Sequence, residues 1–127
     1  MRYLKIFAVT LVSVSALSSA AFAQAQQRAR DCVVAGALNS FGTNSTGTIT
    51  VNAGESCNML LNTAGTLEAS EISAQPKNGT LRMEGMANAI YTPKAGFTGD
   101  DEFAFTIKGR NQQVSGTSVL VIRANVK

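Results

Sequence analysis

The side chains that could do chemistry in this chain are few, and three of them are consecutive. Asp100, Asp101 and Glu102 form its acidic cluster, and carboxylate oxygens are ligands that calcium prefers. These three residues are therefore the candidate calcium ligands. Successive side chains of a strand point to opposite faces, however, so all three cannot face one ion. We expect a solvated turn with one capping aspartate rather than a metal site.

The two cysteines, Cys32 and Cys57, are well separated in the sequence. They lack the C-x-x-C spacing of redox-active thiols, and two thiolates cannot complete a four-thiolate zinc site. An even pair in an exported chain instead predicts a disulfide bond. On a chain-entropy account, closing a loop of this length stabilises a domain by roughly 3–4 kcal/mol.

Catalytic chemistry is poorly supported. The chain has no histidine, which removes histidine-based acid–base catalysis and histidine-containing metal sites. A serine–lysine dyad would need Lys77, Lys94 or Lys108 as its base, but the sequence has no S-x-x-K motif. We therefore predict that the protein is not an enzyme, with no catalytic residue and no cofactor.

The first residues are typical of a secretory signal peptide. Arg2 and Lys5 give a positive start, and residues 6–17 are apolar. Residues 21–23 (AFA) provide the small side chains of a cleavage site. A membrane span needs roughly 20 apolar residues, more than this stretch has. We expect cleavage after Ala23, giving a periplasmic or secreted protein whose mature chain has no membrane span.

Cleavage also changes the charge. Loss of Arg2 and Lys5 lowers the net charge from +3 by two, to +1. Nucleic-acid binding needs Lys and Arg side chains clustered on one face, whereas those of the mature chain are scattered. We expect residues 24–30 to be a flexible tail, residues 31–127 to form one domain, and no nucleic acid to bind.

The mature chain shows short strand patterns and no sustained helical period. In residues 102–108, Phe103, Phe105 and Ile107 alternate, so they must share the core face. Further strands are predicted at residues 32–38, 48–51, 57–61, 67–74, 80–83, 89–92 and 118–124. The total of about seven or eight short strands predicts an antiparallel β-sandwich.

Two of these segments carry additional information. Residues 118–124 have apolar side chains on both faces, which is typical of a central strand. Asn78-Gly79 is a strong signal for a type I′ turn, because both central positions of that turn need a positive φ. This turn is expected to join strands 67–74 and 80–83 in a hairpin.

Residues 74–127 also carry a series of spaced motifs. They read PKNGTL at residues 76–81, YTP at 91–93 and GFTGDDEF at 96–103, followed by a valine-rich last strand. This half of the mature chain resembles the bacterial immunoglobulin-like, cadherin-like domains of exported proteins. The resemblance implies an immunoglobulin-like β-sandwich. The residues of this structural motif are Tyr91, Pro93, Gly96, Phe97, Gly99, Asp101 and Phe103.

Each motif residue suits an architectural role. The Tyr91 ring can be buried while its hydroxyl anchors a corner, and Pro93 can end a strand because it has no N–H. The two glycines permit turn conformations closed to other residues. Phe97 can plug one end of the sandwich, and Asp101 can accept N–H bonds within its turn. The motif thus identifies a fold rather than a chemistry.

The expected function is that of an exported, non-catalytic binding or structural module of the bacterial cell envelope. Its partner would be an unknown protein or an envelope glycan. Residues 39–47 (NSFGTNSTG) are the candidate contact loop, since exposed loops often carry recognition. Two other hypotheses stay open: a secreted adhesin or host-interaction factor, and a small inhibitor of an exported hydrolase.

Overall fold

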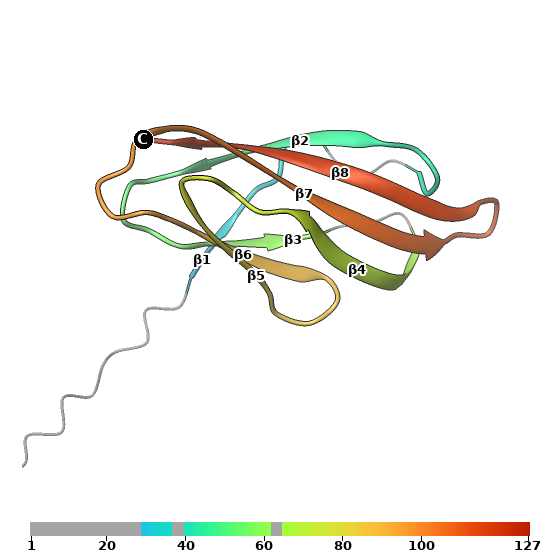
Figure 1. Cartoon of the computed structure of the whole chain (residues 1–127). Helices are drawn as coiled ribbons and strands as arrows, with labels where there is room; N and C mark the ends of the chain where they lie inside the picture. The colour runs from blue at the N-terminus through green and yellow to red at the C-terminus, as the bar shows by residue number, and fades with distance from the viewer. Residues whose placement is uncertain (1–28, 37–39, 62–64) are drawn as a thin grey trace, which may run out of the picture.

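The computed structural model describes residues 29–36, 40–61 and 65–127, which form a sandwich of two four-stranded sheets (Figure 1). One sheet has the strand order β1-β3-β6-β5 and the other β2-β8-β7-β4. The strands are β1 (Arg30–Cys32), β2 (Ser45–Val51), β3 (Cys57–Leu60), β4 (Thr66–Ala74), β5 (Gly79–Met83), β6 (Asn88–Pro93), β7 (Gly99–Arg110) and β8 (Ser115–Val126). The described residues contain no helix, and hence none that could cross a membrane. The all-β sandwich predicted from the sequence is confirmed.

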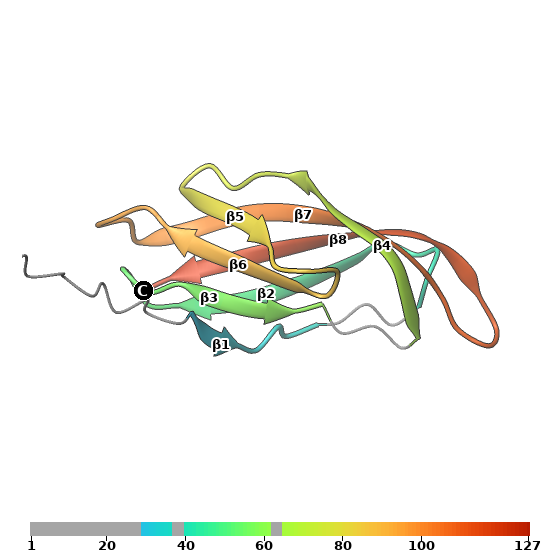
Figure 2. The same cartoon turned by 90° about the horizontal axis from the view of Figure 1, so that it is seen from below.

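Two strand pairs depart from the antiparallel arrangement that was expected. β1 runs parallel to β3, and β2 runs parallel to β8. Parallel neighbours cannot be joined by a tight hairpin. Here the chain instead enters one sheet with β1, crosses to the other with β2, and returns with β3 (Figure 2). The antiparallel prediction is therefore wrong for these two edge strands.

β7 and β8 form a long hairpin in which both strands exceed their predicted lengths. Each strand has 12 residues, against predicted ranges of 102–108 and 118–124. Gly109, beyond the predicted end of the strand, lies inside β7, and the Phe41 ring fills the space that a Cβ there would need. The sheet order places β8 between β2 and β7, so the prediction of a central strand is confirmed.

The core lies between the sheets and contains the alternating side chains that the sequence indicated. Phe103, Phe105 and Ile107 are at most 1% exposed. The Phe103 ring stacks on Tyr91 at 5.1 Å between centroids and meets Phe105 edge-on at 5.9 Å. Such aromatic pairs add about 0.5–1.5 kcal/mol beyond their buried area, so this cluster is a strong point of contact between the two sheets.

The prediction of a hairpin at Asn78-Gly79 is wrong. β4 and β5 belong to different sheets, and residues 75–78 carry the chain from one sheet to the other. Neither Asn78 nor Gly79 has a positive φ, as a type I′ turn would require. Gly79 is needed for space instead, since a Cβ there would lie 2.5 Å from the carbonyl oxygen of Thr92 and 2.8 Å from the Tyr91 ring.

Candidate functional site

Asp101 is buried where β7 begins, and four hydrogen bonds compensate its carboxylate. Oδ1 accepts the backbone N–H groups of Lys77 and Glu102 at 3.1 and 3.0 Å. Oδ2 accepts the Asn78 N–H at 3.1 Å and the Tyr91 hydroxyl at 2.9 Å. Burying a charge is costly unless it is hydrogen-bonded, so these donors explain why a carboxylate that is only 6% exposed is tolerated.

We call this group of residues the Asp101 corner. It joins β7 to β6 through Tyr91 and to the crossing segment through Lys77 and Asn78. The Tyr91 hydroxyl is thus anchored, but most donors to Asp101 come from outside the turn in which they were expected. Burial, followed by the hydrogen bond to Asp101 and its negative charge, raises the pKa of Tyr91 well above its usual value.

The neighbours of Asp101 in the sequence point away from it. Asp100 and Glu102 are exposed on the outer face of the sheet, as the alternation of a strand requires. Asp100 Oδ1 accepts the side-chain N–H of Asn125 at 2.8 Å, and Glu102 pairs with Arg123 at 3.4 Å. The three candidate calcium ligands therefore do not converge. Among the described residues, no three or more His, Cys, Asp or Glu side chains gather as a metal site.

A groove of about 810 Å³ runs over the outer face of β2, β8 and β7, beside the crossing segment. Its floor is two rungs of facing residues, Thr48–Arg123–Glu102 and Thr50–Asn125–Asp100. The groove is lined by Thr48, Ile49, Thr50, Ala74, Gln75, Lys77, Asn78, Asp100, Asp101, Glu102, Arg123, Ala124 and Asn125. Most of these side chains were not singled out from the sequence.

The Asp101 corner fixes the shape of this groove. The Asp101 carboxylate, which lies between two floor residues in the sequence but faces the core, accepts hydrogen bonds from the backbone N–H groups of Lys77 and Asn78, which form the wall. Wall and floor are thus connected through hydrogen bonds to a buried carboxylate. A site whose groups are already in place loses less entropy when it binds a ligand.

Residues 39–47, the predicted contact loop, are largely part of the fold. β2 already begins at Ser45, and Phe41 is only 2% exposed within the core. The Gly42 N–H donates to Ser118 Oγ at 2.9 Å, which ties this turn to β8. The loop prediction is therefore wrong for the part that forms β2, and its first residue lies outside the described residues.

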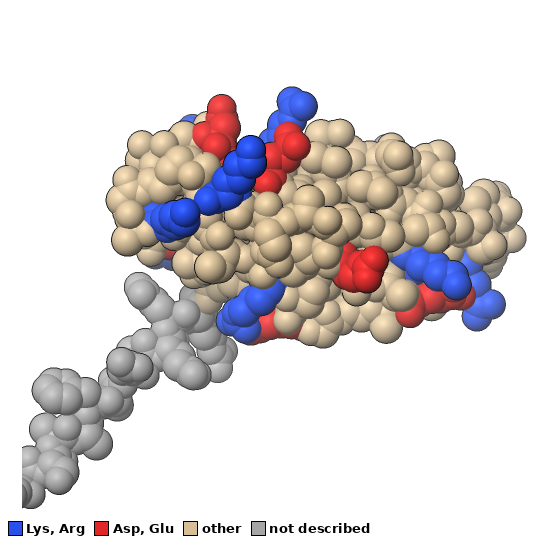
Figure 3. Space-filling view, in the orientation of Figure 1, with Lys and Arg blue, Asp and Glu red and all other residues tan. Residues whose placement is uncertain are grey.

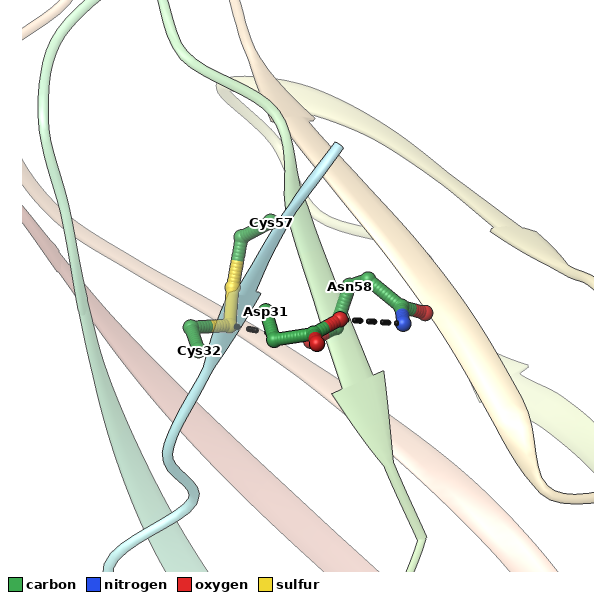
Figure 4. Close-up of a disulfide and its surroundings, with 4 residues drawn as sticks. All are labelled: Asp31, Cys32, Cys57 and Asn58. Carbon is green, nitrogen blue, oxygen red and sulfur yellow. Dashed lines mark hydrogen bonds between the residues drawn. A yellow bond between two sulfur atoms is a disulfide. The ribbon is translucent and has the colours of Figure 1, made fainter. Parts of the chain in front are cut away.

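The predicted disulfide joins Cys32 of β1 to Cys57 of β3 (Figure 4). The Cα atoms are 5.6 Å apart, a separation typical of disulfides. Beside the bond, the Asn58 side chain donates a hydrogen bond of 2.8 Å to Asp31 Oδ1. The disulfide therefore attaches an edge strand to its neighbour within one sheet and does not connect the two sheets.

Residues 29–36, which we call the N-terminal segment, close one side of the sandwich. β1 starts at Arg30, within the expected tail, and ends at Cys32 rather than continuing to residue 38. Ala35 then exchanges two backbone hydrogen bonds with Thr48 of β2, at 2.9 and 2.8 Å. Val34, which lies between β1 and Ala35 in the sequence, is partly buried and packs against the core. The segment thus spans from the edge of one sheet to the edge of the other.

The remaining motif residues, apart from Phe103, lie in the connection between β6 and β7 or at the strand ends that flank it. Pro93 is the last residue of β6. Gly96 and Gly99 have φ values of 78° and 128°, conformations that other residues rarely adopt. Phe97 packs, partly buried, against the core.

The chain matches a family model described as a bacterial Ig domain over residues 31–122. The comparison with curated proteins gives no match. Three solved structures resemble the fold. PbICP-C, in a complex with falcipain-2, shows 10% identity and a TM-score of 0.39, covering 72% of this chain and 94% of that one. A sialyltransferase from Photobacterium damsela shows 14% identity and a TM-score of 0.38, covering 66% of this chain and 18% of that one. Amebosin shows 18% identity and a TM-score of 0.29, covering 67% of this chain and 97% of that one. Similarity at this level carries no argument about function.

Proposed function

Because this chain belongs to the bacterial Ig domain family, we propose that it is a non-catalytic recognition module of the cell envelope. Family membership and the disulfide between Cys32 and Cys57 indicate an extracytoplasmic protein. In this proposal, residues 1–23 are a cleaved signal peptide. The mature protein then acts in the periplasm or after secretion.

The observation that carries the proposal is the groove over β2, β8 and β7. It combines a concave surface with polar side chains from two rungs and a wall that Asp101 holds in place. Precisely placed polar groups orient a ligand in its binding site and make the binding specific. The groove replaces the 39–47 loop as the surface through which we expect recognition.

Affinity capture from an envelope extract tests this proposal, with Arg123→Ala as the groove variant. Arg82→Ala is the matched control, because Arg82 forms an exposed ion pair with Glu84 on the other sheet. The two arginine side chains are similarly exposed, at 69% and 65%. We expect the wild type and the control to retain one ligand that Arg123→Ala loses. Equal capture by both variants would show that the groove is not the recognition surface.

The adhesin and hydrolase-inhibitor hypotheses remain predictions. Cell fractionation separates the first from the proposed function, because a protein found only in the periplasm cannot contact a host directly. An inhibitor would form a stable equimolar complex with an exported hydrolase, which size-exclusion chromatography of the captured material would reveal.

A further inference from the structure

The side chains of the groove offer hydrogen bonds of every kind. Apart from the buried Asp101, its polar residues are Thr48, Thr50, Gln75, Lys77, Asn78, Asp100, Glu102, Arg123 and Asn125. Hydroxyl and amide groups both donate and accept, the carboxylates accept, and the guanidinium and ammonium groups donate. A ligand that matches this surface must therefore carry donors and acceptors side by side along its length.

The exposed charges of the groove cancel, and the buried Asp101 carboxylate is compensated by its own four hydrogen bonds. Lys77 and Arg123 oppose Asp100 and Glu102, and Arg123 and Glu102 form a direct ion pair of 3.4 Å. Acidic and basic side chains are also interleaved over the visible face of the molecule (Figure 3). Polyanions bind where cations cluster, and charged partners are attracted by surfaces of the opposite sign. A ligand without net charge fits this groove better than either.

The groove also lacks the large apolar side chains on which protein interfaces depend. The large hydrophobic side chains that are exposed in the described residues, Val33, Leu60, Met86 and Val114, all lie outside its lining. Protein partners are held mainly by aromatic and other large anchors in desolvated pockets. The apolar side chains of this lining are Ile49, Ala74 and Ala124, and the first and last of these are buried in the core. The exposed apolar side-chain surface is therefore that of small groups such as Ala74 and the threonine methyls. Such surfaces suit the C–H faces of a sugar ring.

From this chemistry we propose that the groove binds a neutral, hydroxyl-rich glycan chain. The planar groups of Arg123, Asn125 and Glu102 would hydrogen-bond neighbouring hydroxyls, while Thr48 and Thr50 contact the same chain from β2. The inference rests on the proposed function and narrows its ligand class. Each hydrogen bond to the sugar replaces hydrogen bonds to water, so its net contribution to the binding free energy is modest. We therefore expect weak affinity for a short oligosaccharide, with a Kd of about 1 mM.

The test is a titration of the purified exported protein, with its disulfide intact, followed by amide chemical shifts in nuclear magnetic resonance. The probes are three neutral tetrasaccharides, built from α-linked glucose, β-linked glucose and β-linked N-acetylglucosamine. We expect saturable shifts with at least one probe, confined to the two floor rungs and to residues 75–78. Saturable shifts that map to another surface overturn the proposal, and so does the absence of saturable shifts with all three probes.

Variants and a charged probe complete the test. Arg123→Ala and Asn125→Ala should each weaken binding by about fivefold to tenfold, whereas Arg82→Ala should leave it unchanged. Equal effects of Arg123→Ala and Arg82→Ala overturn the assignment to the groove. Tighter binding of polygalacturonate, an anionic polysaccharide, overturns the neutral class. If envelope capture depends on Arg123 but no neutral sugar binds, the proposed recognition stands and the glycan inference fails.

Discussion

The N-terminal segment and the Asp101 corner both attach peripheral chain to the sandwich, but they use different physics. The segment is held by the Cys32–Cys57 disulfide, by a three-residue parallel strand and by one isolated bridge. The corner is held by four hydrogen bonds to one buried carboxylate. A disulfide stabilises mainly by restricting the unfolded chain, whereas the carboxylate satisfies donors that folding has buried. The two regions should therefore fail differently when they are disturbed.

The largest expected effect comes from removing the acceptor at the corner. Asp101→Ala leaves the Tyr91 hydroxyl and the N–H groups of Lys77 and Asn78 without their acceptor. Unsatisfied buried groups cost more than the hydrogen bond itself was worth, so we expect a loss of about 3–5 kcal/mol in the free energy of unfolding. Urea denaturation followed by circular dichroism measures this loss. Asp100→Ala, in the adjacent exposed position, should change stability by less than about 1 kcal/mol; similar losses for both variants would contradict the role of Asp101.

The disulfide should matter somewhat less and should act elsewhere. Replacing Cys32 and Cys57 together by serine should lower the free energy of unfolding by about 2–4 kcal/mol. In the native state, opening should be confined to the N-terminal segment, including the bridge between Ala35 and Thr48. Hydrogen exchange of the oxidised protein and of this variant measures that difference. The Asn78 amide, which bonds Asp101, serves as the internal control; if it loses local protection as much as Thr48 does, the two regions are not independent.

The C-terminal half of the fold could be predicted largely from the sequence. Phe103, Phe105 and Ile107 alternate strictly, and period-two alternation is a local signal that burial on one face enforces. Gly96 and Gly99 marked a turn whose positive φ values the structure contains. The ends of the strands were less predictable. Gly109 lies inside β7, where the ring of Phe41, distant in the sequence, occupies the space of a Cβ.

The contacts that form the groove could not be predicted, because they are not local. Thr48 and Thr50 alternate along one predicted strand, whereas Arg123 lies near the end of another, predicted at residues 118–124, and Asn125 follows that end. Nothing in either pattern indicates that the two strands pair in parallel. The Asp101 corner poses the same difficulty: the turn preference of Asn78-Gly79 gives way to a carboxylate 23 positions from Asn78. Tertiary hydrogen bonds of this kind override local turn propensity.

A smaller effect is expected when one hydrogen bond of the corner is removed without creating a cavity. Tyr91→Phe keeps the ring that stacks on Phe103 and deletes the hydroxyl that donates to Asp101. The carboxylate keeps its three N–H donors, so we expect the free energy of unfolding to fall by about 1–2 kcal/mol. Urea denaturation gives the value. A loss as large as that of Asp101→Ala would mean that the Tyr91 hydroxyl, and not the three N–H donors, carries the corner.

The smallest effect is a pH dependence that only the corner should produce. In the unfolded chain the tyrosine hydroxyl loses its proton near pH 10, whereas burial and Asp101 raise the pKa of Tyr91 in the folded protein. Above about pH 10 the folded state therefore holds more protons than the unfolded state, and its stability falls as the pH rises. Between pH 10 and pH 11 the wild type should lose about 1 kcal/mol more than Tyr91→Phe. Both proteins share the same lysines, so the difference between their urea midpoints isolates Tyr91. The cysteine double variant should keep the wild-type slope, because the disulfide region does not contribute to it; parallel pH profiles for the wild type and Tyr91→Phe would show that the hydroxyl is not held protonated by the corner.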